Sequence, residues 1–406
     1  MVWLIGNMGM LGQQIEKLLL SQSIAYVSSD MDVDITDFSA VEKFTENKDL
    51  KWIINCAAYT AVDNAEDDKE KAFAINATGP ENLAKISSAK KVKLIHISTD
   101  YVFPGTEDRA LNENDITGPV SVYGKTKLDG ETKIIENTKS YFIIRTAWLY
   151  GKYGNNFVYT MLALMNNRNE LMVVNDQVGT PTYAKDLAEL IFQIIRRDSE
   201  LFGIYHFSNE GRISWYDFAI EINRQGLADG IIQNDCRINK CESSQFPTKA
   251  VRPNFSLLSK EKVKKELSIV VNDWKVSLTA FFTENKKMML SMKKYNQQAK
   301  ESLVKAKEFI EKQDYSSVVS SCRSCLRFYF ISHSMLYTDI SEDDAEITVI
   351  IKQSRMLLPT NIINSINDIF GNNKLSQNIS KDTAEMIIKQ TEEITQFIKR
   401  KNILNI

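Results

Sequence analysis

Three side chains of the kinds that transfer a proton to a carbonyl oxygen follow one another along the chain. Thr99 comes after the apolar segment at residues 93–97, and Tyr123 and Lys127 stand four residues apart at the start of a predicted helix. Residues four apart share one face of a helix, so we expect the Lys127 ammonium to favour the phenolate and to lower the pKa of Tyr123 from about 10 towards neutrality. Tyr123 would then donate a proton to a ketone oxygen that the Thr99 hydroxyl polarises. The Tyr–Lys spacing alone also fits a pair of residues on the surface of a helix. We favour the catalytic interpretation because a nucleotide-binding motif lies earlier in the chain.

A glycine-rich turn supplies that signal. Gly6, Gly9 and Gly12 follow a short apolar segment and precede an apolar helical stretch. Glycine lets the backbone turn tightly and approach a pyrophosphate, and the first N–H groups of the helix bind the anion. The acidic segment at residues 30–34 follows the second apolar segment, where a carboxylate accepts hydrogen bonds from ribose hydroxyls. Neither stretch contains a Lys or Arg to bind a 2′-phosphate, so we expect a nicotinamide cofactor, NADH or NADPH, with a weak preference for NADH.

The elements that position these residues alternate over the first 283 residues. Amphipathic stretches separate short Val- and Ile-rich segments that we predict as strands, at Val2–Ile5, Ile24–Val27, Trp52–Asn55, Lys93–Ile97 and Phe142–Arg145. This alternation is typical of a parallel sheet covered by helices on both faces. We therefore expect an α/β fold with a Rossmann-type doubly wound parallel sheet.

Composition points to a globular protein of the cytoplasm. The 406 residues, which predict two domains, carry a formal net charge of −2 and give no reason to expect a polyanion binder. The apolar N-terminal segment lacks the basic residues and the cleavage pattern of a signal peptide. The sequence has no run of 18 apolar residues, so we expect no membrane span. The five cysteines, an odd number in a long chain, fit a reducing cytoplasm better than a disulfide framework.

Longer segments of the chain carry a family signature. They are residues 55–63 (NCAAYTAVD), 98–105 (STDYVFPG), 122–128 (VYGKTKL), 145–150 (RTAWLY), 154–157 (GNNF) and 175–182 (NDQVGTPT). These segments resemble the dTDP-4-dehydrorhamnose reductase family of extended short-chain dehydrogenases, in which the G-x-x-G-x-x-G spacing is also typical. The resemblance implies a reductase domain at residues 1–283, whose C-terminal part, from about residue 150, binds the substrate.

The same resemblance implies a reaction and a set of site residues. The reaction would be hydride transfer from NAD(P)H to the C4 keto group of a dTDP-4-keto-6-deoxy-L-sugar, giving dTDP-L-rhamnose or a closely related deoxysugar, with tyrosine as proton donor. The catalytic residues would be Thr99, Tyr123 and Lys127. The cofactor would be bound by Gly6, Gly9, Met10, Leu11, Gly12, Asp34, Ile35, Ala57, Ala58, Tyr59, Ile97, Tyr123 and Lys127. The dTDP-sugar would be bound by Thr99, Asp100, Tyr123, Trp148, Asn156 and Arg252.

Several alternatives stay open at this point. Trp148 also fits a core aromatic residue, and Arg252 a surface arginine. Gln14 stands where some family members carry a metal-binding glutamate, so we predict no metal. Another protein group of this fold is a non-catalytic regulatory subunit of methionine adenosyltransferase, but the complete Thr–Tyr–Lys set argues against that function. The sequence does not decide whether the chain forms a homodimer. We expect His96 and His206, at or near apolar strands, to be buried structural residues.

The tail at residues 284–406 has the pattern of amphipathic helices. Its segment 300–315 resembles a HEPN domain, and some HEPN domains are RNases with an Arg–His pair at the spacing of Arg327 and His333. The tail has 18 Lys and Arg against 15 Asp and Glu, so its small positive charge argues against nucleic-acid binding. We therefore expect a module that binds a protein partner or a nucleotide, with Cys322 and Cys325 as packing residues rather than half of a zinc site.

Overall fold

The computed structural model describes residues 1–406 except 235, 339–345, 354–355, 357, 372–378 and 402–406. The chain forms two compact units, each assembled from separate segments. Unit 1 consists of residues 1–153, 172–221 and 238–281. Unit 2 consists of residues 154–171, 222–237 and 282–406, so it combines the tail with two segments from earlier in the chain.

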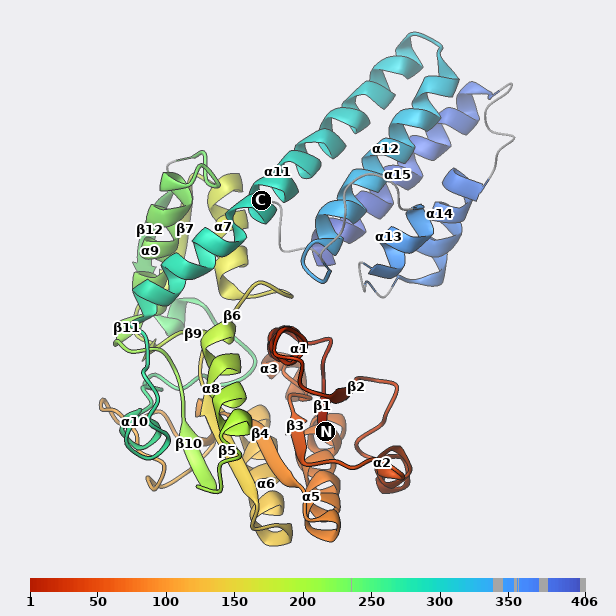
Figure 1. The fold of residues 1–406 in the computed structure, drawn as a ribbon. Coiled ribbons are helices and arrows are strands. Elements are labelled where there is room, and N and C mark those ends of the chain that lie inside the picture. The colour runs from red at the N-terminus through yellow and green to blue at the C-terminus, as the bar shows by residue number, and fades with distance from the viewer. Residues whose placement is uncertain (235, 339–345, 354–355, 357, 372–378, 402–406) are drawn as a thin grey trace. The chain divides into compact units, whose positions relative to one another are not determined.

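A six-stranded parallel sheet forms the centre of unit 1 (Figure 1). Its strands are β1 (Val2–Ile5), β2 (Tyr26–Ser29), β3 (Trp52–Asn55), β4 (Lys93–Thr99), β5 (Tyr141–Thr146) and β10 (Gly203–His206), in the order β10-β5-β4-β3-β1-β2. The five predicted strands are confirmed, with β2 shifted towards the C-terminus, and β10 was not predicted. Chain order reverses between β1 and β3, and ligands of doubly wound folds bind outside the carboxyl ends of the strands at such a switch point.

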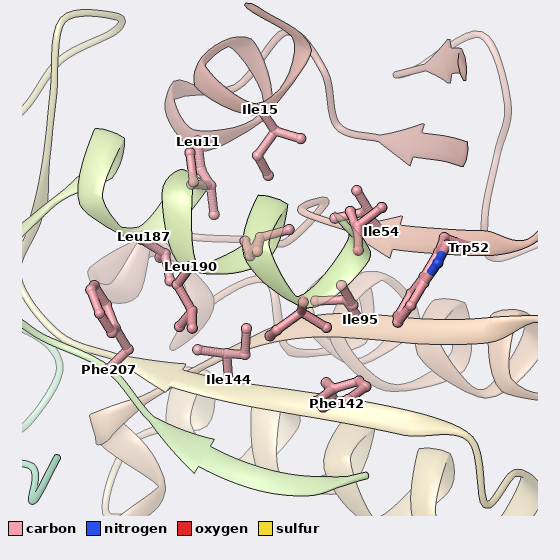
Figure 2. Close-up of a cluster of buried hydrophobic side chains, with 14 of the residues drawn as sticks. Leu11, Ile15, Trp52, Ile54, Ile95, Phe142, Ile144, Leu187, Leu190 and Phe207 are labelled. Atoms are coloured by element: carbon pink, nitrogen blue, oxygen red, sulfur yellow. The ribbon is translucent and has the colours of Figure 1, made fainter. Parts of the chain in front are cut away.

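Helices cover both faces of this sheet, as the alternation predicted. The helices α1 (Met10–Ser21) and α8 (Ala184–Arg196) pack on one face. On the other face lie α2 (Phe38–Thr45), α5 (Gly79–Lys90) and α6 (Val122–Asn137). Each strand therefore buries side chains in both directions, and Figure 2 shows the first of the two apolar cores. In that core Ile54 and Ile95 face Leu11 of α1 and Leu190 of α8, whereas the neighbouring Ile53 points to the opposite core.

Shorter elements complete unit 1. The strand pairs beyond the main sheet are β6 with β9, β7 with β12, and β8 with β11. These strands are β6 (Leu149–Tyr150), β7 (Glu170–Val174), β8 (Val178–Gly179), β9 (Thr182–Tyr183), β11 (Ile213–Ser214) and β12 (Arg237–Cys241). The short helices are α3 (Val62–Ala65), α4 (Lys69–Phe73), η1 (Ala74–Thr78), η2 (Asp100–Val102), η3 (Ser243–Gln245) and α10 (Glu261–Leu267). The longer α9 (Trp215–Ala228) begins in unit 1, and its residues from 222 onward belong to unit 2.

Unit 2 is helical. Its helices are α7 (Phe157–Asn167), the second half of α9, most of α11 (Trp274–Glu311), α12 (Tyr315–Ser334), α13 (Ile347–Gln353), α14 (Thr360–Gly371) and α15 (Lys381–Lys401). The predicted helical spacing is confirmed in α15, where Ile387, Ile394 and Ile398 are buried. Helix α11 passes without a break through residues 283–287, so no linker separates the tail from the preceding segment. No helix among the described residues is long and apolar enough to cross a membrane.

Candidate functional site

In the glycine turn between β1 and α1, close packing requires glycine at Gly6 and Gly12, whereas Gly9 has free space beside it. Gly6 has a φ of +74°, and a Cβ there would lie 2.8 Å from the backbone nitrogen of Ala57. A Cβ at Gly12 would lie 2.1 Å from the Gly6 carbonyl oxygen. At Gly9 the nearest atom to a Cβ is that same oxygen, at 3.3 Å, so the space beside Gly9 is not filled by packing. No described side chain caps α1 and its first turn has no acidic residue, which suits the binding of an anion at this helix N-terminus.

The side chains of the two residues that follow Gly9 pack against other parts of unit 1. Leu11 is buried in the first apolar core. Met10 lies close to Gly151, whose Cβ would be 3.3 Å from the Met10 Cγ. Their backbone N–H groups, at the first positions of α1, are the part of each residue suited to a phosphate.

The acidic segment after β2 has three carboxylates, and two of them, Asp30 and Asp34, have different partners. Oδ2 of Asp30 accepts a hydrogen bond of 3.2 Å from the backbone N–H of Met8 in the glycine turn. Asp34 is exposed, and its Oδ1 accepts bonds from the backbone N–H and the hydroxyl of Thr36, at 2.9 and 2.7 Å. The predicted Ile35 is buried in the second apolar core. The structure thus adds Asp30, which sequence analysis did not single out within the segment, to the predicted Asp34.

The loop after β3 contains Ala57, Ala58 and Tyr59, and is held from two sides. A Cβ at Gly6 would touch the Ala57 backbone, so the loop and the glycine turn are in contact. Asn76 accepts a 2.8 Å bond from the Tyr59 N–H and donates a 3.2 Å bond to its carbonyl oxygen. The same amide donates to the Thr126 hydroxyl of α6, at 3.1 Å. The loop that is predicted to line the cofactor is therefore tied to the helix that carries the predicted catalytic residues.

Thr99 and Tyr123 meet at the carboxyl end of β4. Thr99 is the last residue of β4, and Tyr123 lies in the first turn of α6, which Ser121 caps. The Thr99 hydroxyl is near enough to the Tyr123 hydroxyl to act on its pKa. The Thr99 hydroxyl donates a 3.0 Å bond to Oδ1 of Asp100 and accepts a 3.2 Å bond from the Tyr101 N–H. The structure thus brings together the predicted proton donor and the predicted polarising hydroxyl.

Lys127 lies one turn further along α6 and is 1% exposed. Its Nζ lies 2.6 Å from the carbonyl oxygen of Ile97 and 3.2 Å from Nε2 of His96. Burial lowers the pKa of Lys127 to about 8, against the opposing effects of Glu131 and Cys56. Near neutral pH this amine therefore lies close to the point where it gains or loses a proton.

The expectation that Lys127 lowers the pKa of Tyr123 is wrong at this site. Burial raises the pKa of Tyr123 to about 12, and the Asp100 carboxylate acts in the same direction. The hydrogen bond with Thr99 lowers this pKa only in part. The physical reason is that desolvation opposes the phenolate more strongly than its neighbours favour it. Tyr123 therefore keeps its proton at neutral pH.

A buried ion pair anchors α6 to the sheet beside Lys127. Glu131, 1% exposed, contacts Arg145 of β5, 3% exposed, with a shortest N–O distance of 2.7 Å. The Arg145 Nε also donates to both carboxylate oxygens, at 3.0 and 3.2 Å. Ser98 of β4 donates a further bond of 2.5 Å to Glu131. These contacts fix the helix that carries Tyr123 and Lys127 against β4 and β5.

Trp148, which the sequence could also place in the core, lies after β5 and is only half-buried. Its φ is +49°, a left-handed backbone that is rare for a bulky residue and costs about 1–3 kcal/mol. Its ring stacks on Trp215, with centroids 3.7 Å apart and planes at 14°. A Cβ at Gly179 would lie 3.0 Å from this ring, so glycine there leaves room for it. Such strain concentrates at functional sites, which favours a binding role for Trp148 over plain core packing.

Two more predicted substrate residues are held by charged or polar partners. Burial raises the pKa of Asp100 to about 6, although hydrogen bonds with Ser256 and Thr99 oppose this shift. Arg252 forms a bidentate ion pair with Asp63. Its Nη1 donates a 3.1 Å bond to Oδ1, and its Nη2 donates a 2.8 Å bond to Oδ2. This contact holds the pKa of Asp63 at about 2. Arg252 is therefore a partly buried, oriented guanidinium rather than a plain surface arginine.

The remaining predicted residues belong to unit 2. Asn156 caps α7, where its Oδ1 accepts a 3.3 Å bond from the Tyr159 N–H. Arg327 and His333 both lie in α12, and six residues of a helix place them on different faces. His333 is 3% exposed. The structure does not bring these two side chains together as a pair at a surface.

Cys322 and Cys325 are both buried within α12, in keeping with their predicted packing role. Cys325 Sγ lies 3.9 Å from the Thr395 hydroxyl. Burial raises the pKa of Cys322 to about 11. Cys322 is therefore not in the thiolate form that binds a metal.

Sequence analysis missed most of the partners that surround the predicted residues. They are Asp30, Asn55, Asp63, Glu131, Arg145, Trp215 and Ser256. Two of them carried a local signal: Glu131 follows Lys127 by one helical turn, and Asp30 begins the acidic segment. The predicted burial of His96 and His206 is confirmed, but the contact between His96 and Lys127 was not foreseen.

Known proteins resemble this chain over the same segment. The family model for the RmlD substrate binding domain matches residues 1–287. The dTDP-4-dehydrorhamnose reductase of Aggregatibacter actinomycetemcomitans is 38% identical over 283 residues, which cover 67% of this chain and 95% of the relative. That of Escherichia coli K12 is 37% identical, covering 70% and 97%.

Solved structures agree with these relatives. A dTDP-4-dehydrorhamnose reductase from Clostridium acetobutylicum has a TM-score of 0.66 and 40% identity, covering 70% of this chain and 98% of its own. The Bacillus anthracis reductase in complex with NADP has a TM-score of 0.66 and 37% identity, with the same coverage.

Proposed function

Because this chain belongs over residues 1–287 to the family of dTDP-4-dehydrorhamnose reductases, we propose that it reduces the C4 keto group of a dTDP-4-keto-6-deoxy-L-sugar. The product is dTDP-L-rhamnose or a closely related deoxysugar. The observation that carries this proposal is the placement of the three predicted catalytic residues. Thr99 ends β4, Tyr123 lies in the first turn of α6, and the buried Lys127 lies one turn further, with its Nζ 2.6 Å from the Ile97 carbonyl oxygen of β4.

The chain has the features that a nicotinamide cofactor requires. The space beside Gly9, the uncapped start of α1 and the close approach of Gly6 to Ala57 fit a pyrophosphate at the glycine turn. Gly6, Gly9, Met10, Leu11 and Gly12 would hold it through their backbones, with Asp34, Ile35, Ala57, Ala58, Tyr59 and Ile97 lining the rest of the site. When bound, the cofactor supplies the hydride for the reduction.

Asp30 supports a preference for NADH. Its carboxylate lies at the end of β2 and is bonded to the glycine turn, which is the place where an acidic residue contacts the ribose in dinucleotide-binding folds. A 2′-phosphate at this position would meet like charge, whereas a 2′-hydroxyl would gain a hydrogen-bond acceptor.

The protonation of the site suits reduction rather than oxidation. A tyrosine with a pKa of about 12 carries its proton at neutral pH, so Tyr123 is in the form that donates to a ketone oxygen. Thr99, whose hydroxyl lies near that of Tyr123, polarises the same oxygen. Lys127 in its ammonium form stabilises the phenolate that remains and returns a proton to it.

The nucleotide sugar would be recognised by three predicted residues of unit 1 and by the predicted Asn156 of unit 2. Arg252 offers two donors to the diphosphate, in exchange for its present contact with Asp63. Trp148 offers an aromatic face, Asp100 a carboxyl group beside Thr99, and Asn156 an amide.

A Tyr123→Phe variant tests the proposed reduction. Purified protein is mixed with NADH or NADPH and the dTDP-4-keto-6-deoxy-L-sugar, and loss of the reduced-nicotinamide absorbance is followed. Removing the hydroxyl should lower kcat about 100- to 10,000-fold, because general acid catalysis is lost. Tyr141→Phe, at the start of β5 and remote from the carboxyl ends of the strands, is the matched control. Full turnover by the Tyr123→Phe enzyme would refute the mechanism, and no turnover by the unchanged enzyme would refute the substrate.

For the tail we propose an accessory role as a HEPN-like module at residues 284–406 that binds a protein partner or a nucleotide. The buried position of His333 and its separation from Arg327 on α12 count against RNA cleavage. None of the five cysteines forms a disulfide, which supports a cytoplasmic location. RNA incubated with the full chain should stay intact, and cleavage that an Arg327→Ala variant abolishes would overturn this proposal.

A further inference from the structure

Lys127 is in contact with a row of buried polar side chains. The other two members, Asn55 and His96, have no role in the proposed mechanism. Asn55, the last residue of β3, is directly paired with His96 in the middle of the neighbouring strand β4. Both are fully buried, at 0% exposure. Nδ2 of Asn55 lies 3.1 Å from Nδ1 of His96, and Nε2 of His96 lies 3.2 Å from Nζ of Lys127. The three side chains therefore form a continuous polar contact from the cofactor loop to the catalytic lysine.

The directions of these hydrogen bonds follow from one backbone contact. The Ala57 N–H donates a 3.0 Å bond to Oδ1 of Asn55, which fixes the orientation of the amide. The Asn55 Nδ2 group, a donor only, therefore faces Nδ1 of His96, which must accept. A neutral imidazole has one N–H group, so its proton lies on Nε2 and points at the lysine nitrogen.

The surroundings keep His96 neutral. Burial and the nearby Lys127 lower the pKa of His96 well below its usual range. Burial raises the pKa of the Cys56 thiol to about 12, so Cys56 carries no charge near neutrality. The Glu131 carboxylate also faces Lys127, but it is paired with Arg145. Among the described groups, Lys127 is thus the one that titrates in this cluster near neutral pH.

An Nε2–H group distinguishes the two forms of the lysine. The free amine has a lone pair that accepts this hydrogen bond, while Nζ still donates to the Ile97 carbonyl oxygen. An ammonium has no lone pair and cannot accept this bond, so two hydrogen-bond donors would face each other at an unfavourable contact. Hydrogen bonding to the neutral form of a group disfavours its charged form.

We propose that His96 is a positioning residue of the reductase site, which holds the Lys127 amine through its Nε2 proton and sets the pH above which Lys127 stops supplying a proton. Asn55 acts through His96, because its amide selects the imidazole tautomer. This inference rests on the proposed function for its catalytic consequence, but the tautomer itself is independent of any substrate.

The first experiment is a nitrogen NMR measurement on the full chain with ¹⁵N-labelled histidine. The protein has three histidines, so His206→Gln and His333→Gln variants assign the signals by elimination. We expect His96 to carry its proton on Nε2 and to show no titration between about pH 5 and 9. An Nδ1–H tautomer, or a positively charged imidazole in this range, would overturn the proposal whether or not the enzyme is active.

The second experiment is the pH profile of kcat for a His96→Gln variant. The glutamine amide can turn its oxygen towards Lys127 and accept from the ammonium, so the alkaline limb of the profile should move up by about one pH unit. KM for the sugar should change little, because His96 is not among the proposed substrate residues. His333→Gln, another buried histidine, lies in unit 2 and is the matched control with an unchanged limb. A folded His96→Gln enzyme whose kcat falls at the same alkaline pH as that of the unchanged protein would overturn the proposed role of His96. An unchanged enzyme with no activity would refute only the proposed function.

Discussion

Replacing Glu131 by Gln tests how strongly the catalytic helix depends on its buried ion pair. Glu131 accepts hydrogen bonds from Arg145 and from Ser98. A glutamine keeps one acceptor oxygen but turns an NH2 group towards the guanidinium. Arg145, 3% exposed, would then be a buried charge without a counter-charge at Glu131.

The structure gives the size of the expected effect. Both members of the pair are almost fully buried, so the loss is that of a buried pair with one partner removed, about 3–5 kcal/mol in the free energy of unfolding. An exposed pair would contribute below about 1 kcal/mol. A double variant, Glu131→Met with Arg145→Leu, removes both charges and should be more stable than the Glu131→Gln protein, because apolar residues of similar volume often replace a buried pair at little cost.

Urea unfolding followed by tryptophan fluorescence is the appropriate assay. All five tryptophans lie in unit 1, so their emission reports the unfolding of the part that contains the pair. The unchanged protein, the single variant and the double variant are compared at one pH. A loss below about 1 kcal/mol for Glu131→Gln, or a double variant less stable than the single one, would refute the reasoning.

Further predictions concern the cofactor and the pH dependence. Turnover should fall as the pH rises through about 8, because burial lowers the pKa of Lys127 to that value and the ammonium form is lost above it; a limb near pH 10.5, the usual value for lysine, would contradict this. Gly12→Ala should weaken NADH binding, measured by fluorescence titration, by about tenfold or more, since the new Cβ lies 2.1 Å from the Gly6 carbonyl oxygen. The control Gly118→Ala, whose Cβ makes contacts of 3.7 Å or longer, should bind as before. Asp30→Asn should raise kcat/KM with NADPH relative to NADH by about tenfold, and an unchanged ratio would show that Asp30 does not face the ribose.

Local patterns in the sequence predicted the frame of the site well. The glycine spacing, the apolar strand segments and the Tyr123–Lys127 spacing are all set by residues close together in the chain, and they appear in the structure as expected. Strand β10 escaped prediction because Gly203–His206 is short and contains no Val- or Ile-rich run.

The chemistry of the site depended on contacts that the sequence does not show. Asn55, His96 and Lys127 come from three separate elements, and only the strand pairing and the packing of α6 bring them together. The pKa of Tyr123 was predicted in the wrong direction for the same reason, since the degree of burial is a property of the folded chain. Spacing shows which groups are neighbours on a helix, but not how much water they lose.

The unbroken helix α11 means that the tail cannot be severed cleanly from the reductase. The family match ends at residue 287, inside this helix of 38 residues. A chain stopped there would leave the last carbonyl groups of a helix without N–H partners. Beyond this cut, Lys293 donates to the carbonyl oxygens of Gly230 and Ile231, and just before it Lys286 pairs with Asp229. Residues 222–237 fall within the segment that matches the relatives, yet they belong to the same compact unit as the tail, so part of the reductase segment and the fused tail share one unit.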